Sequence, residues 1–326
     1  PTHLIVMVNG IIGSPKNWRY AAKQFVKAHP HDILVHCSEA NYSALTFHGV
    51  DVMGKRLANE VVSIVNSHPS LGKISFVGHS LGGLIARFAI ALLYRRDENG
   101  DQTTSSVRIA GLVPMNFITF ATPHLGSRGH KQVPMFCGWY AVENAASRAS
   151  TLLGRTGKHL FLRDSRKGKL PLLVKMSNDS NDLKFLSALQ SFGKRMAYAN
   201  VAFDHIVGWS SSSLRRLNEL PKKRTLRKNT DYRHVVNEEF SSPSPPSITN
   251  TDHVEQVPSE TRVFKSRISE MEETMISGLT RLDWHRIDVS FEGTVQSCFA
   301  HNTIQVQNRI LNSQGTDVIQ HMIHHF

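Results

Sequence analysis

A glycine-flanked serine lies where an apolar strand pattern changes into a helical pattern. Residues 73–87 read K-I-S-F-V-G-H-S-L-G-G-L-I-A-R, in which a strand-like run precedes Ser80 and a helix-forming stretch begins near Leu84. A serine on such a turn needs neighbours without a Cβ, because strand and helix pack closely around it. This context is typical of a G-x-S-x-G nucleophile elbow and predicts Ser80 as a nucleophile. An ordinary glycine turn is the alternative.

Apolar runs alternate with helical patterns along the chain, which favours βα units and a mostly parallel sheet. The helical pattern is clearest from Val50 to Ile64, where apolar residues recur every three or four positions. With 326 residues and 40% hydrophobic content, the chain can build a proper core, and we expect one α/β domain over residues 1–326. The runs expected to form strands are Leu4–Val8, Ile33–His36, Ile74–Val77, Phe117–Phe120, Ala197–Ala202 and Ile287–Phe291.

A serine nucleophile needs a base, and an acid that orients the base. In a chain with a nucleophile elbow, the acid comes later in the sequence, directly after a late strand of the sheet. Asp204 comes directly after the strand expected at 197–202, so we predict that it is the acid, with a turn or cap aspartate as the alternative. Asp179 and Asp182 are weaker candidates because no expected strand precedes them.

The base has to be chosen by position, since the chain contains 18 histidines. His301 follows the last expected strand, where a triad histidine belongs, and we predict that it is the base. A surface or capping histidine is the alternative. His285 precedes that strand and would emerge at the opposite end of the sheet, while His79 is expected to point away from its neighbour in the elbow.

An oxyanion hole requires two backbone N–H groups, one just after the nucleophile and one from the loop after an earlier strand. Leu81 supplies the first. The first expected strand ends at Asn9-Gly10-Ile11-Ile12-Gly13, so we predict that Ile11 supplies the second. A plain strand-to-helix turn is the alternative.

Two long stretches interrupt the alternation of strands and helices. Residues from about 125 to 194 carry helical pieces with large apolar side chains directly after a strand, and we expect them to form a lid. Residues from about 210 to 279 hold a basic run and then S-S-P-S-P-P-S-I-T-N-T, and we expect a mobile insertion. The lid apolars are Phe136, Trp139, Tyr140, Leu152, Leu153 and Phe161.

The net charge of +12 is concentrated in two segments, at residues 155–175 and 215–228. Such clusters attract anionic surfaces. Solvated loops are the favoured interpretation, followed by contact with an anionic membrane, and nucleic acid is the least favoured.

The remaining composition indicates a protein of a reducing compartment. Cys37, Cys137 and Cys298 are widely spaced and form no C-x-x-C, which argues against a disulfide framework. No apolar run approaches the roughly 20 residues that span a bilayer. We expect a cytoplasmic protein with peripheral membrane contact at most. The chain starts at Pro1, which suggests a fragment or a processed form, so organelle targeting stays open.

Three histidines near the C-terminus, His321, His324 and His325, resemble the edge of a packed helix. Their spacing matches no zinc template, and no carboxylate or cysteine joins them in the sequence. We therefore expect no metal and no organic cofactor.

Six motifs are spread over most of the chain: V-M-V-N-G-I-I-G-S at 6–14, V-H-C-S-E at 35–39, F-V-G-H-S-L-G-G-L-I-A-R at 76–87, F-A-T-P-H-L-G-S-R-G at 120–129, G-R-T-G-K-H-L-F-L at 154–162 and Y-A-N-V-A-F-D-H-I-V-G-W at 198–209. They make the chain similar to the eukaryotic serine esterase family of lipase-like α/β-hydrolases, and most of all to its plant members. The resemblance implies hydrolysis of esters, with acyl lipids as substrates, and supports the roles of Ser80, Asp204 and His301. Many lipases carry H-G where this chain has Asn9-Gly10, and strands that usually come first in such folds are missing before Pro1.

Two other functions remain open at this point. A non-catalytic member would use the same fold for binding or as a scaffold. An acyltransferase would share the acyl-enzyme step and pass the acyl group to an acceptor other than water.

Overall fold

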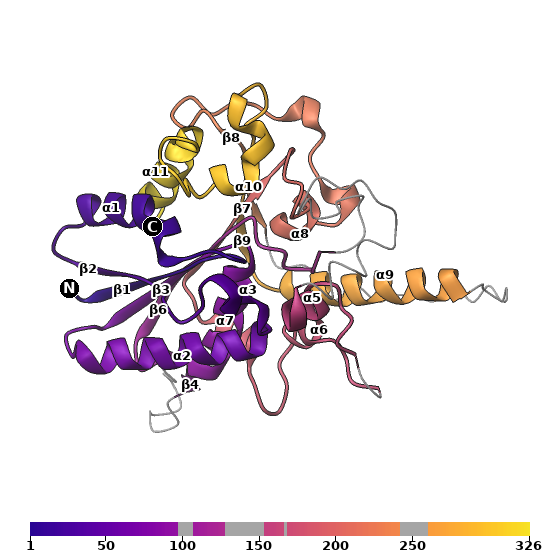
Figure 1. The fold of residues 1–326 in the computed structure, drawn as a ribbon, viewed down its shortest axis with the longest axis horizontal. Coiled ribbons are helices and arrows are strands. Elements are labelled where there is room, and N and C mark those ends of the chain that lie inside the picture. Colours follow the sequence, from indigo (N-terminus) through magenta and orange to yellow (C-terminus); the bar gives the residue numbers. More distant parts are fainter. Residues whose placement is uncertain (97–106, 128–152, 166–167, 242–259) are drawn as a thin grey trace.

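The computed structural model describes residues 1–96, 107–127, 153–165, 168–241 and 260–326. A seven-stranded sheet with the order β2-β1-β3-β6-β7-β9-β8 forms its centre (Figure 1). All neighbouring strands are parallel except β8, which pairs antiparallel with β9 at the edge. The strands are β1 (His3–Val8), β2 (Ile33–Cys37), β3 (Lys73–His79), β6 (Val113–Phe120), β7 (Lys194–Asn200), β8 (Val235–Ser241) and β9 (Trp284–Val289), and a separate pair consists of β4 (Tyr94–Arg96) and β5 (Val107–Ile109).

Helices cover both faces of the sheet (Figure 1). On one face, α1 (Arg19–Ala28) and α11 (Thr316–His324) enclose a core that contains Trp18, Phe25 and Ile319. On the other face, α2 (Val50–Ser67), α3 (Leu81–Leu93) and α7 (Phe185–Gln190) enclose a second core. The apolar stripe expected from Val50 to Ile64 is the buried side of α2, as its spacing predicts.

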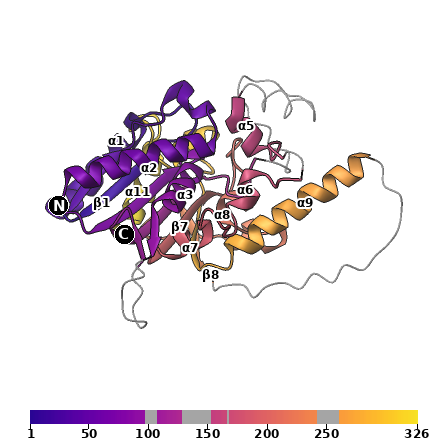
Figure 2. The same cartoon turned by 90° about the horizontal axis from the view of Figure 1, so that it is seen from below.

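Shorter helices connect these layers, and α9 extends away from them. The α9 helix (Glu260–Leu279) leads outward from the body of the molecule (Figure 2). Its C-terminal residues, including Met275 and Leu279, are buried. The remaining helices are α5 (Gly154–Leu160), α6 (Leu172–Lys175), α8 (Trp209–Ser213), α9 (Glu260–Leu279) and α10 (Ala300–Thr303), and single turns of 3₁₀ helix occur at Pro15–Trp18, Ser43–Phe47, Leu217–Glu219, Lys223–Thr225, Val295–Phe299 and Ser313–Gly315.

The six expected strands are confirmed, but β8 was not expected. The mobile insertion predicted at about 210–279 is wrong for its described residues, because β8 is part of the central sheet and α9 contributes to the core. The sequence of β8, V-V-N-E-E-F-S, is mostly polar. An edge strand has a neighbour on one side only and can keep polar side chains, which hides it from a search for apolar runs. The Ser/Pro-rich segment after residue 241 lies outside the described residues.

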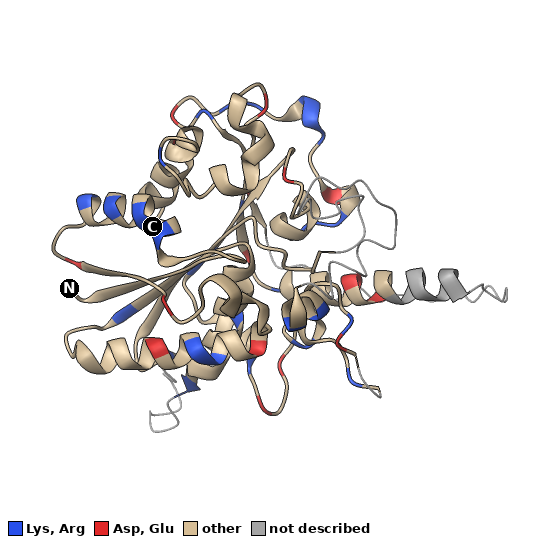
Figure 3. Cartoon of the chain, in the orientation of Figure 1, with Lys and Arg blue, Asp and Glu red and all other residues tan. Residues whose placement is uncertain are grey.

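The basic run that begins at Arg215 is less exposed than its sequence suggests. Arg215 is fully buried, and its Nη1 donates to both carboxylate oxygens of Asp288 at 2.8 and 3.0 Å. Arg216 is paired with Glu273 at 2.5 Å. The exposed part of the run is therefore the loop that carries Lys222, Lys223, Arg224, Arg227 and Lys228. Elsewhere, α1 carries only basic charge, whereas α2 carries both signs (Figure 3).

The stretch expected to form a lid is only partly described. Its C-terminal end does not belong to a lid, because Phe185, Leu189 and Phe192 are buried in the core beside α3. Residues 153–161 lie near Ser80, as described below. The expected lid apolars Phe136, Trp139, Tyr140 and Leu152 lie outside the described residues, so the lid itself stays a prediction.

The parallel sheet passes into the α3 helix through a tight turn that carries Ser80 at the carboxyl end of β3. A sheet of this kind, flanked by helices and bearing a nucleophile elbow, is the α/β-hydrolase fold that the sequence predicts. Within the described parts of the chain, no helix is both long and apolar enough to cross a membrane.

Candidate active site

Ser80 occupies a strained backbone position between β3 and α3. Its φ of 54° and ψ of −126° lie outside the regions that residues with a Cβ normally adopt. The surrounding structure holds this conformation, in part through a 2.8 Å hydrogen bond from the Ser80 N–H to the carbonyl oxygen of Phe120. Strain of this kind is concentrated at functional sites, where the fold over-determines the backbone.

The glycines around Ser80 are required by close backbone contacts. A Cβ on Gly82 would lie 2.2 Å from the carbonyl oxygen of Val8, and a Cβ on Gly78 would lie 2.6 Å from the backbone of Gly83. Backbone atoms cannot move aside as a flexible side chain can. The turn can therefore form only with glycine at these positions, which explains the G-x-S-x-G spacing physically.

Asp204 and His301 are hydrogen-bonded to each other, although 97 positions separate them. The distance from His301 Nδ1 to Asp204 Oδ2 is 3.0 Å, and both residues are buried. The second oxygen, Asp204 Oδ1, accepts hydrogen bonds from the backbone N–H groups of Ile206 and Val207 at 3.0 and 2.9 Å. Asn200 Nδ2 donates to Oδ2 at 2.9 Å.

These partners keep Asp204 ionised. Burial by itself would raise the pKa of Asp204, but the charge of His301 and the hydrogen bonds from His301, Val207 and Asn200 outweigh it and lower the pKa below the usual 3.8. An ionised carboxylate on Nδ1 holds the imidazole in the tautomer whose Nε2 is free to accept a proton.

His79 connects this pair to the elbow, which the sequence did not reveal. Its Nε2 lies 2.7 Å from the backbone carbonyl oxygen of His301, and the two rings are 4.7 Å apart. Burial, followed by the nearby charge of His301, lowers the pKa of His79 to about 3. The ring is therefore neutral near pH 7, and we assign its proton to Nε2, which donates to the carbonyl. The sequence pattern predicts no role as a base for His79, and its contact connects the His301 backbone to the residue that directly precedes Ser80.

Asn9 holds the loop after β1 in place through side-chain hydrogen bonds. The Asn9 side chain is buried and donates to the carbonyl oxygens of Gly10 and Asn41 at 3.1 and 3.0 Å. In the sequence, Asn9 stands out only as the residue that replaces a lipase histidine. Its contacts show that it ties the Ile11 loop to the segment that follows β2.

Ile11 and Leu81, the two expected oxyanion donors, line the same small cavity as Ser80. Leu81 is the first residue of α3, so its N–H has no acceptor within the helix. The positive end of the helix dipole also points toward this cavity, which favours negative charge there.

The cavity at Ser80 is narrow and apolar. Its volume is about 20 Å³, close to the size of one water molecule, and Ser80 and Ser127 are the only polar side chains among the described residues that line it. A neighbouring cavity of about 160 Å³ shares Ser127 and Ile206 with it. The apolar lining consists of Ile11, Leu81, Pro123, Leu153, Leu160, Phe161, Ile206 and Val207.

The rival acid and base found in the sequence lie elsewhere. Asp179 accepts hydrogen bonds from the backbone N–H groups of Leu186 and Ser187, so it caps α7. His285 is the second residue of β9 and binds Glu238 at 2.9 Å, at the end of the sheet where the parallel strands begin. Asp182 is exposed in the bend that precedes α7.

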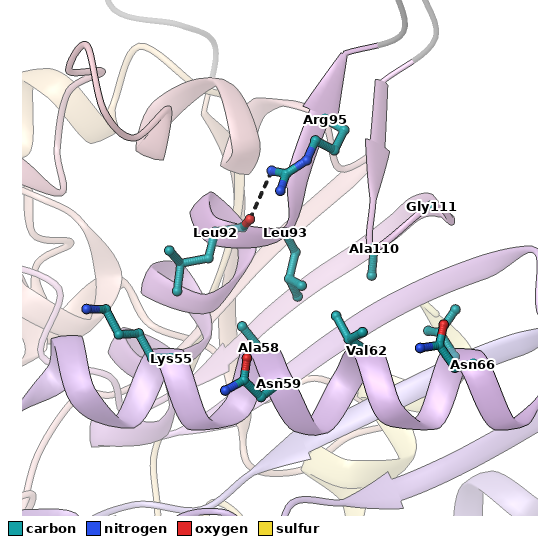
Figure 4. Close-up of a pocket in the computed structure, with 11 residues that line it drawn as sticks. Lys55, Ala58, Asn59, Val62, Asn66, Leu92, Leu93, Arg95, Ala110 and Gly111 are labelled. Carbon is teal, nitrogen blue, oxygen red and sulfur yellow. Dashed lines mark hydrogen bonds between the residues drawn. The ribbon is translucent and has the colours of Figure 1, made fainter.

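A larger cavity of about 630 Å³ lies away from this site, between α2 and the end of α3 (Figure 4). Lys55 and Asn59 point toward it from α2, and Arg95 lies above them (Figure 4). None of the described residues that line it is a serine, histidine or acid. It therefore lacks the groups that ester chemistry needs.

A family model with the description Putative serine esterase matches residues 1–214. A Saccharomyces cerevisiae protein named putative lipase YDL109C is 31% identical over 217 residues, which make up 65% of this chain and 30% of that protein. Putative lipase ROG1 of the same yeast is 30% identical over 247 residues, covering 72% of this chain and 32% of that protein. The chain thus spans about a third of the length of these relatives.

Among solved structures, the lipase BlEst2 of Bacillus licheniformis in its propeptide form is similar with a TM-score of 0.37 and 17% identity. The match covers 61% of this chain and 36% of that chain. The relatives named here come from a yeast and a bacterium, so the expected likeness to plant members stays a prediction.

Proposed function

Because this chain belongs to the family described as Putative serine esterase, we propose that it hydrolyses carboxylic esters with Ser80 as nucleophile, His301 as base and Asp204 as the acid that orients the base. The observation that carries the proposal is a continuous set of contacts: Asp204 holds the His301 ring, and His79, the neighbour of Ser80, holds the His301 backbone. Acid, base and elbow are thereby joined in one buried cluster.

In the proposed reaction, Ser80 Oγ attacks the ester carbonyl carbon while its proton passes to His301 Nε2. The His301 imidazolium, stabilised by Asp204, then gives this proton to the leaving alkoxide as the ester C–O bond breaks. Water attacks the resulting acyl-enzyme, and its proton returns through His301 to Ser80 Oγ. The carboxylic acid is released and the enzyme is regenerated.

The negative charge on the carbonyl oxygen is stabilised by backbone donors in this proposal. The N–H groups of Leu81 and Ile11 are assigned this role because both residues line the cavity at Ser80. The start of α3 adds the favourable field of its dipole. Asn9 positions the Ile11 loop through its hydrogen bond to Asn41.

The substrates that fit this site best are esters of apolar acids, with acyl lipids as the natural class. The apolar side chains of Leu153, Leu160 and Phe161 supply a surface that an acyl chain can bury, at about 0.8 kcal/mol for each CH₂ group. A cavity of about 20 Å³ cannot hold such a chain. Residues 153–161 therefore have to move apart when a long acyl group binds, as a lid would.

Labelling with a fluorophosphonate probe tests the nucleophile directly. We expect the purified chain to form a covalent adduct on the peptide that contains Ser80, and Ser80→Ala to form none. Ser127→Ala is the matched control, because Ser127 is the other serine in the same cavity, and this variant should still be labelled at Ser80. Ser80→Ala should also lower hydrolysis of a short p-nitrophenyl ester by about 10⁴- to 10⁶-fold.

Absence of labelling in the folded wild-type chain would support the alternative of a non-catalytic scaffold. An acyltransferase would be labelled like an esterase, since both form an acyl-enzyme. Supplying an alcohol acceptor separates the two, because an acyltransferase releases an ester whereas an esterase releases mainly the free acid.

A further inference from the structure

Two of the three C-terminal histidines meet a carboxylate that is far away in the sequence. Glu238 of the edge strand β8, together with His321 and His325 of the α11 region, places three potential ligand atoms within 4.8 Å of one another. Lys194, the first residue of β7, donates to the backbone of His325. The cluster therefore lies where the parallel strands begin, whereas Ser80 follows the end of β3.

His321 is the centre of this cluster. It is fully buried, and its Nδ1 lies 2.8 Å from the hydroxyl oxygen of Tyr198. Its Nε2 is buried without a hydrogen-bond partner, although Glu238 Oε1 is only 3.3 Å away. The distance between these two atoms suits a pair of metal ligands.

Each of the other two members has one ligand atom free, although the His325 ring is stacked on His321 with centroids 4.1 Å apart and has to turn for its Nε2 to meet the same ion. His325 Nδ1 donates to the backbone carbonyl oxygen of His321 at 2.9 Å, which leaves a lone pair on His325 Nε2. Glu238 Oε2 accepts from His285 Nε2 at 2.9 Å, which leaves Oε1 for another partner. Histidines and carboxylates that bind a metal are typically held in place by hydrogen bonds of this kind.

We propose that Glu238 Oε1, His321 Nε2 and His325 Nε2 bind a divalent transition-metal ion, for which Zn²⁺ is the best match. Two imidazoles and one carboxylate are a common zinc ligand set, and Zn–N and Zn–O bonds are about 2.0–2.1 Å long. A tetrahedron with bonds of that length has edges of roughly 3.3 Å. The separation of 3.3 Å between Glu238 Oε1 and His321 Nε2 is thus the value that two zinc ligands would have.

Such an ion would act on structure rather than on ester chemistry. It would connect α11 to the edge strand β8, and the Glu238 side chain, which is 27% exposed, leaves solvent access for a water molecule as fourth ligand. His321 can bind through Nε2 only in the tautomer that donates from Nδ1 to the Tyr198 hydroxyl. Tyr198 is therefore a positioning residue for the site, and the inference does not depend on the proposed esterase activity.

Zinc binding by the full chain, after treatment with a chelator, tests the proposal. In a competition titration against a chromogenic chelator we expect one tight site, which Glu238→Gln and His325→Ala each weaken by more than about 100-fold. Tyr198→Phe, which keeps the ring stacked on Phe120, should weaken binding by about 10- to 100-fold. His324→Ala is the matched control, because His324 is exposed and outside the cluster. It should bind like the wild type.

Thermal melting supplies a second measurement. One equivalent of Zn²⁺ should raise the melting temperature of the wild type and of His324→Ala, and should leave that of Glu238→Gln unchanged. The proposal is overturned if the wild type binds no zinc tightly, or if the two ligand variants bind as tightly as His324→Ala. In that case Glu238 serves only as an ion-pair partner of His285 and His321.

Discussion

Replacing Asp204 by asparagine is the sharpest test of the proposed triad, because it changes hydrogen-bonding capacity with almost no change in shape. The native carboxylate accepts four hydrogen bonds, from two backbone N–H groups, from Asn200 and from His301. An asparagine has one acceptor oxygen and an NH₂ group that can only donate. If the oxygen stays on the backbone N–H groups of Ile206 and Val207, the NH₂ group faces Asn200 and His301.

These two neighbours respond differently to the new donor. Asn200 can rotate its amide, since its Oδ1 is buried without a hydrogen-bond partner and can accept from the new NH₂ group. His301 can adapt only by moving its proton from Nδ1 to Nε2. It can then no longer accept the proton of Ser80. The free energy of unfolding should accordingly fall by about 1.5–3 kcal/mol, because hydrogen bonds to a charged group are lost.

The catalytic cost should be much larger. The wrong tautomer typically lowers turnover by about 10⁴-fold, which corresponds to about 5.5 kcal/mol at about 1.4 kcal/mol per factor of ten. The assay is hydrolysis of a short p-nitrophenyl ester, together with the rate of fluorophosphonate labelling. Asp179→Asn is the matched control, because Asp179 only caps α7 and an asparagine can still accept from its N–H groups. The reasoning is refuted if Asp204→Asn retains a tenth of the wild-type rate while remaining folded.

Three other perturbations have defined outcomes. Because burial lowers the pKa of His79 to about 3, the unfolded chain binds a proton there between about pH 6.5 and 3 that the folded chain does not. The free energy of unfolding should therefore fall with falling pH across that window, by up to about 1.4 kcal/mol per pH unit from this residue. Urea titrations of His79→Phe at several pH values should show a shallower dependence of this free energy on pH. Equal dependence in the wild type and the variant would contradict the assignment. Gly82→Ala places a Cβ 2.2 Å from a backbone oxygen and should destabilise the fold by about 1–3 kcal/mol or more in denaturant titrations. Gly72→Ala is the control, because no atom lies within 4 Å of its added Cβ, and it should change stability by less than about 0.5 kcal/mol. Neutralising the five basic residues of the exposed loop should reduce sedimentation with phosphatidylserine vesicles at low salt, because each basic residue near the membrane surface contributes about 1 kcal/mol to binding. Hydrolysis of a small soluble ester should stay unchanged. The five residues are Lys222, Lys223, Arg224, Arg227 and Lys228. Neutralising the three basic residues of α1 is the control, and equal vesicle binding by all three proteins would mean that the basic loop is merely solvated.

The sequence by itself determined the features that depend on neighbours along the chain. The elbow could be predicted because its glycine spacing is a local pattern between a strand and a helix, although the contact that requires glycine at position 82 is with the distant Val8. The parallel strands could be predicted because buried strands are continuous apolar runs. The positions of Asp204 and His301 followed from a topological rule, that the carboxyl ends of parallel strands meet at one edge. The structure brings these two residues together, and their catalytic roles remain to be tested.

Only the tertiary structure decided the features that depend on residues far apart in the chain. His79 reaches a carbonyl 222 positions away, and Arg215, which the sequence pattern predicts to be a surface charge, is buried against Asp288. The C-terminal histidines seemed to lack a carboxylate because Glu238 lies in a polar edge strand more than 80 positions earlier. Local patterns record which face of an element is buried, but not which element packs against it. Contacts between polar side chains leave no periodic signal in the sequence, so such sites become visible only when the chain is folded.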